Sequence, residues 1–172
     1  KNQHQAKGYR LISEEGGEES PDFDYSVSFA AGGMYSTTGD LYKWHLALLS
    51  DKILSKEAKQ KYFQPKLREG ETLDSYYAYG WDVHKTKRGT TIIQHNGTNK
   101  VFYADFHRYV EDKLTIILLS NKSQRSLNDA PFEIEKIIFE PTYKPIIPIA
   151  ENKANRDFTN RIIEITLQKG LN

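Results

Sequence analysis

Near the middle of the chain runs the stretch Thr90-Thr91-Ile92-Ile93-Gln94-His95-Asn96-Gly97-Thr98. Its first half is rich in threonine and isoleucine, whose β-branched side chains fit the pleated surface of a sheet, so residues 90–95 are predicted to form a strand. Its second half is polar, and a longer apolar strand follows at Leu114-Thr115-Ile116-Ile117-Leu118-Leu119. We interpret the polar tip as one wall of an active site whose other walls lie outside this sequence.

The pair Asn96-Gly97 also has a purely structural interpretation. Asn-Gly is a preferred pair in type I′ hairpin turns, because both residues tolerate the positive φ angles that such turns require. The local sequence fits a turn and an active-site segment equally well, so the choice between them depends on the rest of the chain.

The period-two pattern of a half-buried strand recurs on both sides of this stretch. Residues 76–84, 101–110 and 114–119 are therefore predicted as strands, and residues 85–89 and 111–113 as the turns between them. Together with residues 90–95 these strands form a four-stranded antiparallel meander. The apolar side of the first strand consists of Tyr77, Tyr79, Trp81 and Val83.

The strand at residues 114–119 differs from the other three because it is apolar on both faces. Such a strand is usually covered above and below and paired on both sides. Only the preceding strand is an obvious neighbour within this chain, and a long apolar edge left open is an aggregation site. We therefore expect a second chain, or a missing N-terminal part of the same polypeptide, along the strand from residue Leu114 onwards.

Three helices are predicted from local signals before residue 140. The first, at about 37–50, begins at Thr37 with Asp40 completing a capping box, although Ser36 is an equally good cap. The second, from 54 to about 63, ends before Pro65. Residues 131–139 form a short amphipathic helix that could cover one face of the sheet. The apolar face of the first helix consists of Leu41, Trp44, Leu48 and Leu49.

The two ends of the chain are predicted to lie outside this core. Residues 1–28 are predicted to form a polar surface arm, and three prolines, at 141, 145 and 148, enforce an extended linker before a final helix at about 153–169. The sequence thus predicts an α+β fold, an antiparallel meander flanked by helices. It divides into residues 1–140 and the linker with its helix, residues 141–172.

The composition limits the possible partners and cofactors. With 172 residues, a formal charge of +1 and no long apolar run, nothing favours nucleic acid or a membrane as a partner. No cysteine is present, which excludes a disulfide framework and a thiol nucleophile. The five histidines lack the spacing of metal motifs, so we expect no metal and no cofactor. His84 and His107 fall on the predicted polar sides of their strands.

Five short blocks, taken in order, resemble the C-terminal part of the serine β-lactamase-like hydrolases, the branch of class C β-lactamases, D-alanyl-D-alanine peptidases and esterases. This resemblance covers roughly residues 6–139 and favours the active-site interpretation of Asn96-Gly97. It implies an incomplete β-lactamase/transpeptidase-like fold, similar to penicillin-binding proteins, that lacks its N-terminal strands and nucleophile helix. The blocks are Ala6-Lys7-Gly8-Tyr9, Ala30-Ala31-Gly32-Gly33-Met34-Tyr35-Ser36-Thr37-Thr38-Gly39-Asp40-Leu41, Tyr79-Gly80-Trp81, His95-Asn96-Gly97 and Leu118-Leu119-Ser120-Asn121.

The family has three catalytic motifs, and His95-Asn96-Gly97 is similar to the third, which reads Lys-Thr-Gly or His-x-Gly. By that resemblance His95 lines the pocket and stabilises charge, and Gly97 leaves room for substrate. The backbone N–H of Thr98 would supply one of the two oxyanion donors, oriented toward the place where negative charge develops. The implied substrate-binding residues are His95, Asn96, Gly97 and Thr98. Residues 98–102 carry less glycine than the family usually has there.

The other two motifs are absent from these 172 residues. Neither Ser-x-x-Lys nor Tyr-x-Asn occurs. Ser126-Leu127-Asn128 has the alternative Ser-x-Asn form of the second motif, but it follows the third motif, whereas the family places this element before it. The resemblance therefore implies a fragment of a serine hydrolase that cleaves an ester, amide or β-lactam bond through an acyl-enzyme. This fragment would carry no catalytic residue and would be inactive alone. The alternative is a non-catalytic binding or assembly module on the same scaffold. Family members are mostly exported, which implies an exported or periplasmic location.

Overall fold

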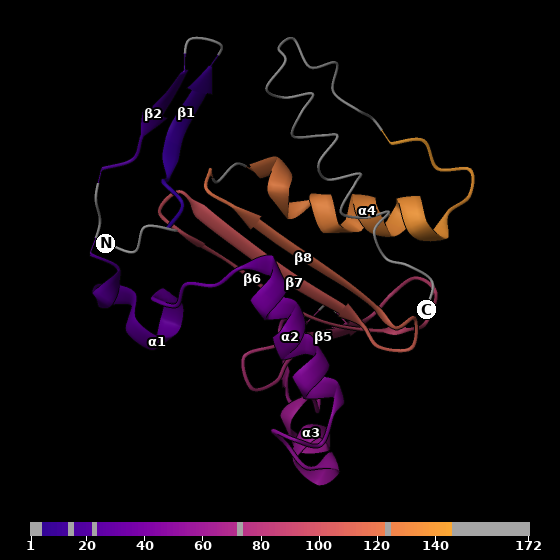
Figure 1. The fold of residues 1–172 in the computed structure, drawn as a ribbon. Helices are drawn as coiled ribbons and strands as arrows, with labels where there is room; N and C mark the ends of the chain where they lie inside the picture. Colours follow the sequence, from indigo (N-terminus) through magenta and orange to yellow (C-terminus); the bar gives the residue numbers. More distant parts are fainter. Residues whose placement is uncertain (1–4, 14–15, 22–23, 72–73, 123–124, 146–172) are drawn as a thin grey trace.

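An antiparallel meander forms the centre of the molecule. The computed structural model describes residues 5–13, 16–21, 24–71, 74–122 and 125–145. Within them the strands follow one another in chain order across a six-stranded sheet, as Figure 1 shows. This confirms the predicted α+β fold with its antiparallel meander. The strands are β3 (Leu67–Arg68), β4 (Ser75–Tyr77), β5 (Asp82–Lys85), β6 (Thr91–Asn99), β7 (Phe102–Tyr109) and β8 (Leu114–Ser120).

The single strand predicted at residues 76–84 is instead a hairpin of β4 and β5. Tyr77 pairs with Asp82, and the N–H of Ala78 donates to the carbonyl of Trp81 at 2.8 Å. Gly80 takes a φ of 79°, which a residue without a Cβ adopts at little cost. The apolar alternation continues through the turn because Trp81 is itself buried, so a period-two pattern alone does not reveal the reversal.

The N-terminal residues also contain more structure than the predicted surface arm. Strand β1 (Tyr9–Ser13) pairs with β2 (Gly16–Glu19) in an antiparallel hairpin. The hairpin is tied to the end of β8, because the N–H of Tyr9 donates to the carbonyl of Asn121 at 2.9 Å and the Asn121 side chain donates to the carbonyl of Lys7 at 2.7 Å. All of β2 is exposed, so it lacks the apolar alternation that marks a strand.

Helices cover both faces of the sheet (Figure 1). On one face lie α2 (Thr38–Leu49) and α3 (Lys56–Tyr62), and on the other lie the 3₁₀ turn η2 (Arg125–Asn128) and α4 (Ala130–Phe139). The predicted cap of α2 is confirmed, since the Thr37 side chain accepts a hydrogen bond from the N–H of Asp40 at 3.1 Å. Two short helical turns, η1 (Tyr25–Ser28) and α1 (Phe29–Gly32), precede α2.

The hydrophobic core is divided between the two faces. On the α2 face, Leu48 packs against Ile93 and Phe106, and on the α4 face Tyr109 packs against Ile92 and Ile116. The predicted apolar face of α2 is only partly buried, because Trp44 and Leu49 remain 41% and 59% exposed. His107, predicted on a polar side, is buried instead at 1% exposure, since η2 and α4 cover that side of β7.

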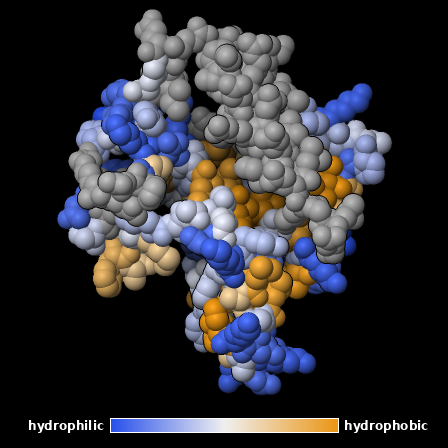
Figure 2. All heavy atoms as spheres, in the orientation of Figure 1, coloured by the Kyte–Doolittle hydropathy of each residue, from blue (hydrophilic) through white to orange (hydrophobic). Residues whose placement is uncertain are grey.

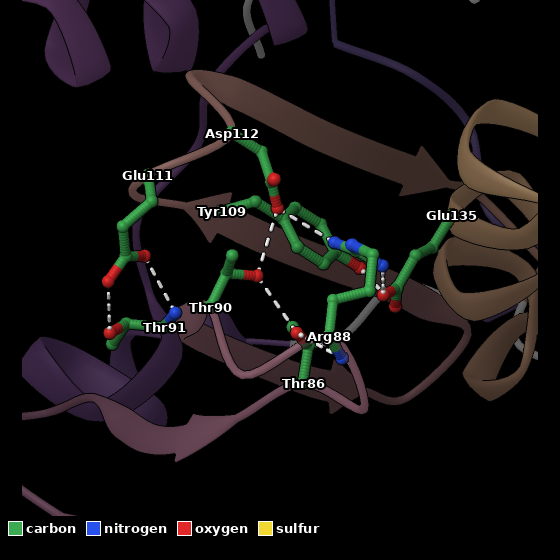
Figure 3. A network of polar contacts seen from close by, with 8 residues as sticks. All are labelled: Thr86, Arg88, Thr90, Thr91, Tyr109, Glu111, Asp112 and Glu135. Atoms are coloured by element: carbon green, nitrogen blue, oxygen red, sulfur yellow. Dashed lines mark hydrogen bonds and ion pairs between the residues drawn. The ribbon is translucent and has the colours of Figure 1, made fainter.

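A polar network holds the two turns at one end of the sheet and α4 together (Figure 3). Arg88, in the β5–β6 turn, makes ion pairs with Asp112 of the next turn and with Glu135 of α4. Its guanidinium also lies 3.7 Å from the centre of the Phe139 ring. Thr90 and Glu111 extend the network to the start of β6. This end of β6 is therefore fixed, opposite to the end that carries His95.

Two predictions concern residues outside this description. The helix at 153–169 and most of the linker before it lie beyond residue 145, so the division into residues 1–140 and 141–172 stays a prediction. Among the described residues, no helix is both long enough and apolar enough to cross a membrane.

Candidate active-site strand

The polar tip is part of a continuous strand. Strand β6 extends to Asn99, and its register pairs Asn96 with Asp105 and Thr98 with Tyr103. The chain turns only after Asn99, at Lys100, which takes a φ of 58°. The hairpin-turn interpretation of Asn96-Gly97 is therefore wrong, and residues 95–98 present their backbone along the edge of a sheet.

One edge of this segment is left without a neighbouring strand in the described residues. Strand β5 pairs with β6 only as far as Gln94, opposite Asp82. The direction of each backbone group follows from the alternation of an antiparallel ladder. The carbonyl of Thr91 accepts from Val110, so odd-numbered residues of β6 bond toward β7. The N–H and C=O of Asn96 and Thr98 therefore point to the open edge.

His95 is held by a tyrosine from a strand that is not its neighbour. The Tyr77 hydroxyl lies 3.0 Å from Nε2 of His95, and the two rings meet edge to face at 6.0 Å between their centres. His95 is exposed and pairs with Phe106, on the α2 face of the sheet. The imidazole is thus oriented while it remains accessible to a ligand. Tyr77 was predicted first as a residue of the apolar side of its strand, because its contact with His95 depends on where β5 begins.

Gly97 leaves open space beside the strand. A Cβ added at this position would have no heavy atom within 4 Å, and its backbone needs no positive φ. Neither packing within the described residues nor backbone conformation therefore explains a glycine here. The position lies on the same face as His95, two residues along β6. The space beside it is accessible to a small molecule.

Asp82 is the first residue of β5, and its pairing with Gln94 places its side chain on the α4 face, next to the open edge of β6. Burial raises the pKa of Asp82, and the charge of nearby Glu69 raises it further, while His95 acts in the opposite direction. Carboxylates with a raised pKa often lie at functional sites, although structural networks raise them as well. Asp82 was not among the predicted site residues, since aspartate at the end of a strand is common in turns.

Asn99 brings a distant block of the chain to the end of β6. Its side-chain amide donates to the hydroxyl of Ser28 at 3.1 Å and to the carbonyl of Gly32 at 3.0 Å. The end of the small-residue block at 30–33 thus lies beside the end of β6. Gly32 and Ser28, the partners of Asn99, lie 67 and 71 positions away in the sequence, so no local signal marks these contacts.

The four predicted site residues lie consecutively on β6 but divide between the two faces. His95 and Gly97 are on the α2 face, whereas Asn96 and Thr98 direct their side chains to the α4 face. All four are exposed. The described part of the chain contains no group of three or more histidine, aspartate or glutamate side chains that could hold a metal ion.

Comparisons with known proteins place these features in context. The family model described as Beta-lactamase matches residues 2–136. Penicillin-binding protein 4* of Bacillus subtilis (strain 168) is 34% identical over 94 residues, which are 54% of this chain and 20% of that protein. The crystal structure of a penicillin binding protein from Bacillus halodurans superposes with a TM-score of 0.61 at 21% identity, covering 77% of this chain and 40% of that one. The chain thus spans less than half the length of either relative.

Proposed function

This chain belongs to the beta-lactamase family, and we propose that it supplies the third-motif strand of a serine hydrolase whose nucleophile lies elsewhere in a longer polypeptide. The intact enzyme would form an acyl-enzyme on a serine and then hydrolyse it, cleaving an ester, amide or β-lactam bond. The observation that carries this proposal is the open edge of β6 at residues 95–98. It combines an oriented histidine, an accessible glycine and outward backbone N–H groups.

Each part of this strand has a role in acyl transfer. The tetrahedral intermediate carries a negative oxygen, which oriented backbone N–H donors stabilise. The N–H of Thr98 points to the open edge, as such a donor must. Gly97 leaves the space in which a substrate backbone could lie along the strand. His95, positioned by Tyr77, adds a polar group at the same face.

These 172 residues do not supply the whole reaction. They contain no Ser-x-x-Lys and no Tyr-x-Asn, so the nucleophile, its lysine and the tyrosine would come from the remainder of the longer polypeptide. The fraction of the structural relative that the chain covers, 40%, is consistent with this division. The chain alone would then bind substrate weakly and hydrolyse nothing by this mechanism.

The proposed remainder has a natural place to join the sheet. In the described residues β8 pairs only with β7, and its pairing places the N–H groups of Ile117 and Leu119 on the open edge. Figure 2 views this side, where hydrophobic residues gather over β8 and α2. Trp44 and Leu49 of α2 stay exposed beside it. We propose that a strand of the missing part pairs with β8.

A glycine substitution tests the proposed site. Gly97→Ala adds one methyl to open space, so the fold should be unchanged while substrate is displaced from the strand. In the intact polypeptide we expect acylation by a fluorophosphonate or penicillin-type probe to fall by about tenfold or more, as for a misplaced substrate. Gly39→Ala, where the added methyl also meets only one atom at 3.8 Å, is the matched control. Equal labelling of both variants would contradict the proposal.

The second candidate function is a binding or assembly module without catalysis. The absence of Ser-x-x-Lys from the sequence favours it. The two candidates predict different results for the intact polypeptide. The hydrolase forms a covalent adduct with the probe, and the module without catalysis does not. If substrate-like molecules bind at Gly97 but no adduct forms, the assembly module is the better description.

A further inference from the structure

A buried polar network lies beneath the candidate strand, on the face opposite His95. It consists of Tyr103, Asp105 and His107, alternate residues of β7 that share the α4 face. The Tyr103 hydroxyl donates to Oδ2 of Asp105 at 2.8 Å, and Nε2 of His107 lies 2.8 Å from Oδ1 of the same carboxylate. The three side chains are 3%, 2% and 1% exposed. Asp105 is thus a buried carboxylate held from both sides.

The network is sealed by η2 and α4. Leu127 of η2 and Ala130 of α4 pack on Tyr103, and the Phe132 ring meets the His107 imidazole edge to face at 5.1 Å. Nδ1 of His107 and Oδ1 of Asp105 make no hydrogen bond within the described residues, so the close contact between His107 and Asp105 does not satisfy either side chain fully. Burying three polar groups in an apolar layer costs free energy. A buried polar network of this kind makes the surrounding structure rigid and fixes its geometry.

The network faces the residues whose backbone points to the open edge. The register places Asp105 opposite Asn96 and Tyr103 opposite Thr98. In both pairs the β6 residue makes no ladder hydrogen bond to β7, so side-chain contacts are what hold the two residues together. Burial and Asp105 raise the pKa of Tyr103, and the neighbouring Asn96 side chain acts in the opposite direction, which places it close to the Tyr103 hydroxyl.

We propose that Asp105 is a positioning residue for the candidate site, acting through Tyr103 on Asn96 and thereby fixing the direction of the Thr98 N–H. Strand β5 gives no support at this point, because it ends opposite Gln94. Among the described strands, only β7 pairs with residues 96–98. This inference rests on the proposed function and adds to it the residues that set the geometry of the oxyanion donor.

Tyr103→Phe tests this role with little change in volume. The substitution removes the hydroxyl that donates to Asp105 and lies close to Asn96, and it leaves the ring in its apolar layer. Tyr109→Phe is the matched control, because Tyr109 is equally buried on the same face of β7 and its hydroxyl also donates to a carboxylate, Glu135, at 3.1 Å. Tyr109 lies at the opposite end of the strand, so both variants lose one hydrogen bond from a buried tyrosine to a carboxylate, but only one of them touches the site.

The first measurement is the acylation rate of the intact polypeptide over a range of probe concentrations. For Tyr103→Phe we expect the maximal rate to fall by about tenfold with a nearly unchanged half-saturating concentration, since the donor is misdirected and binding is kept. For Tyr109→Phe we expect a change of less than about twofold. Equal rates in the two variants, with the wild type labelled, overturn the positioning role. A wild type that takes no label overturns the proposed function instead.

The second measurement needs no activity. In ¹⁵N–¹H spectra of the 172-residue chain, Tyr103→Phe should shift the side-chain amide of Asn96 and the backbone amide of Thr98, and Tyr109→Phe should leave both in place. Unmoved Asn96 and Thr98 signals in Tyr103→Phe overturn the positioning role even if the intact protein is never acylated.

Discussion

The hydroxyl of Tyr77 and Nε2 of His95 lie 3.0 Å apart, although their strands, β4 and β6, do not pair with each other. The strand between them, β5, begins only at Asp82 opposite Gln94, and the space before its first residue lets the two side chains meet. The same gap opens the edge of β6 at residues 95–98. One shortened strand therefore both orients the histidine and exposes the backbone that we assign to substrate.

The contact between Tyr77 and His95 gives the first prediction. In the intact polypeptide, Tyr77→Phe should slow acylation by a fluorophosphonate probe about two- to twelvefold, because one neutral hydrogen bond contributes about 0.5–1.5 kcal/mol. Tyr76→Phe, in the neighbouring position of β4, should acylate at the wild-type rate. A Tyr77→Phe variant that matches the wild type would show that His95 needs no such support.

The second prediction concerns the network at the other end of β6. Arg88→Ala should lower the free energy of unfolding by about 1–2 kcal/mol, measured by urea denaturation of the chain. The value is moderate because the Arg88 side chain is 30% exposed, and solvent screens its two ion pairs. Lys87→Ala, in the same turn, should change stability by less than about 0.5 kcal/mol. Similar losses in both variants would mean that the network adds nothing to ordinary turn stability.

The third prediction is a pH dependence that arises from His84. Burial lowers the pKa of His84 in the folded chain, below its ordinary value of 6.5. The unfolded chain then binds a proton that the folded chain excludes, so His84 reduces stability as the pH falls through and below about 6.5. In His84→Gln the free energy of unfolding should fall less steeply between about pH 7.5 and about 5.5. The slope should decrease by at most about 1.4 kcal/mol per pH unit, the contribution of one proton.

Lys85→Gln is the control for this pH dependence, since it changes the next residue of β5 and leaves His84 in place. It should keep the wild-type slope. If His84→Gln shows the same slope as the wild type, another group dominates acid sensitivity in this range.

The fourth prediction concerns the open edge of β8. Because the N–H of Leu119 points away from β7, Leu119→Pro should preserve the sheet and block pairing along the edge. We expect the wild-type chain to self-associate in sedimentation velocity and Leu119→Pro to do so less. Leu118→Pro removes a ladder hydrogen bond to β7 and should unfold the chain. Unchanged association in Leu119→Pro would place the contact surface elsewhere.

The parts of the fold with strong local signals could be predicted from the sequence. Thr37 and Asp40 define the start of α2 by themselves, and the β-branched runs of β6 and β8 locate both strands. The turn at Gly80 was missed because alternation continues through it, and the hairpin of β1 and β2 was missed because β2 is exposed along its whole length and shows no apolar alternation. Short-range patterns do not record such reversals.

The candidate site was predictable only in its central strand. His95 and Gly97 are identified by a motif, and the resemblance to the family led to their assignment. Tyr77, Asn99 and Asp105 join the site through contacts across strands or over tens of residues, so no spacing in the sequence marks them. The burial of His107 depends on α4, which covers β7 from a distant part of the chain.

The most direct test of the central claim is the intact mass of the polypeptide from its native source before and after treatment with a fluorophosphonate or penicillin-type probe, followed by peptide mapping of the adduct. We expect a protein larger than 19.9 kDa that gains one probe mass on a serine outside residues 1–172. A protein larger than 19.9 kDa that carries no adduct, or an adduct on a serine within these residues, would contradict the account.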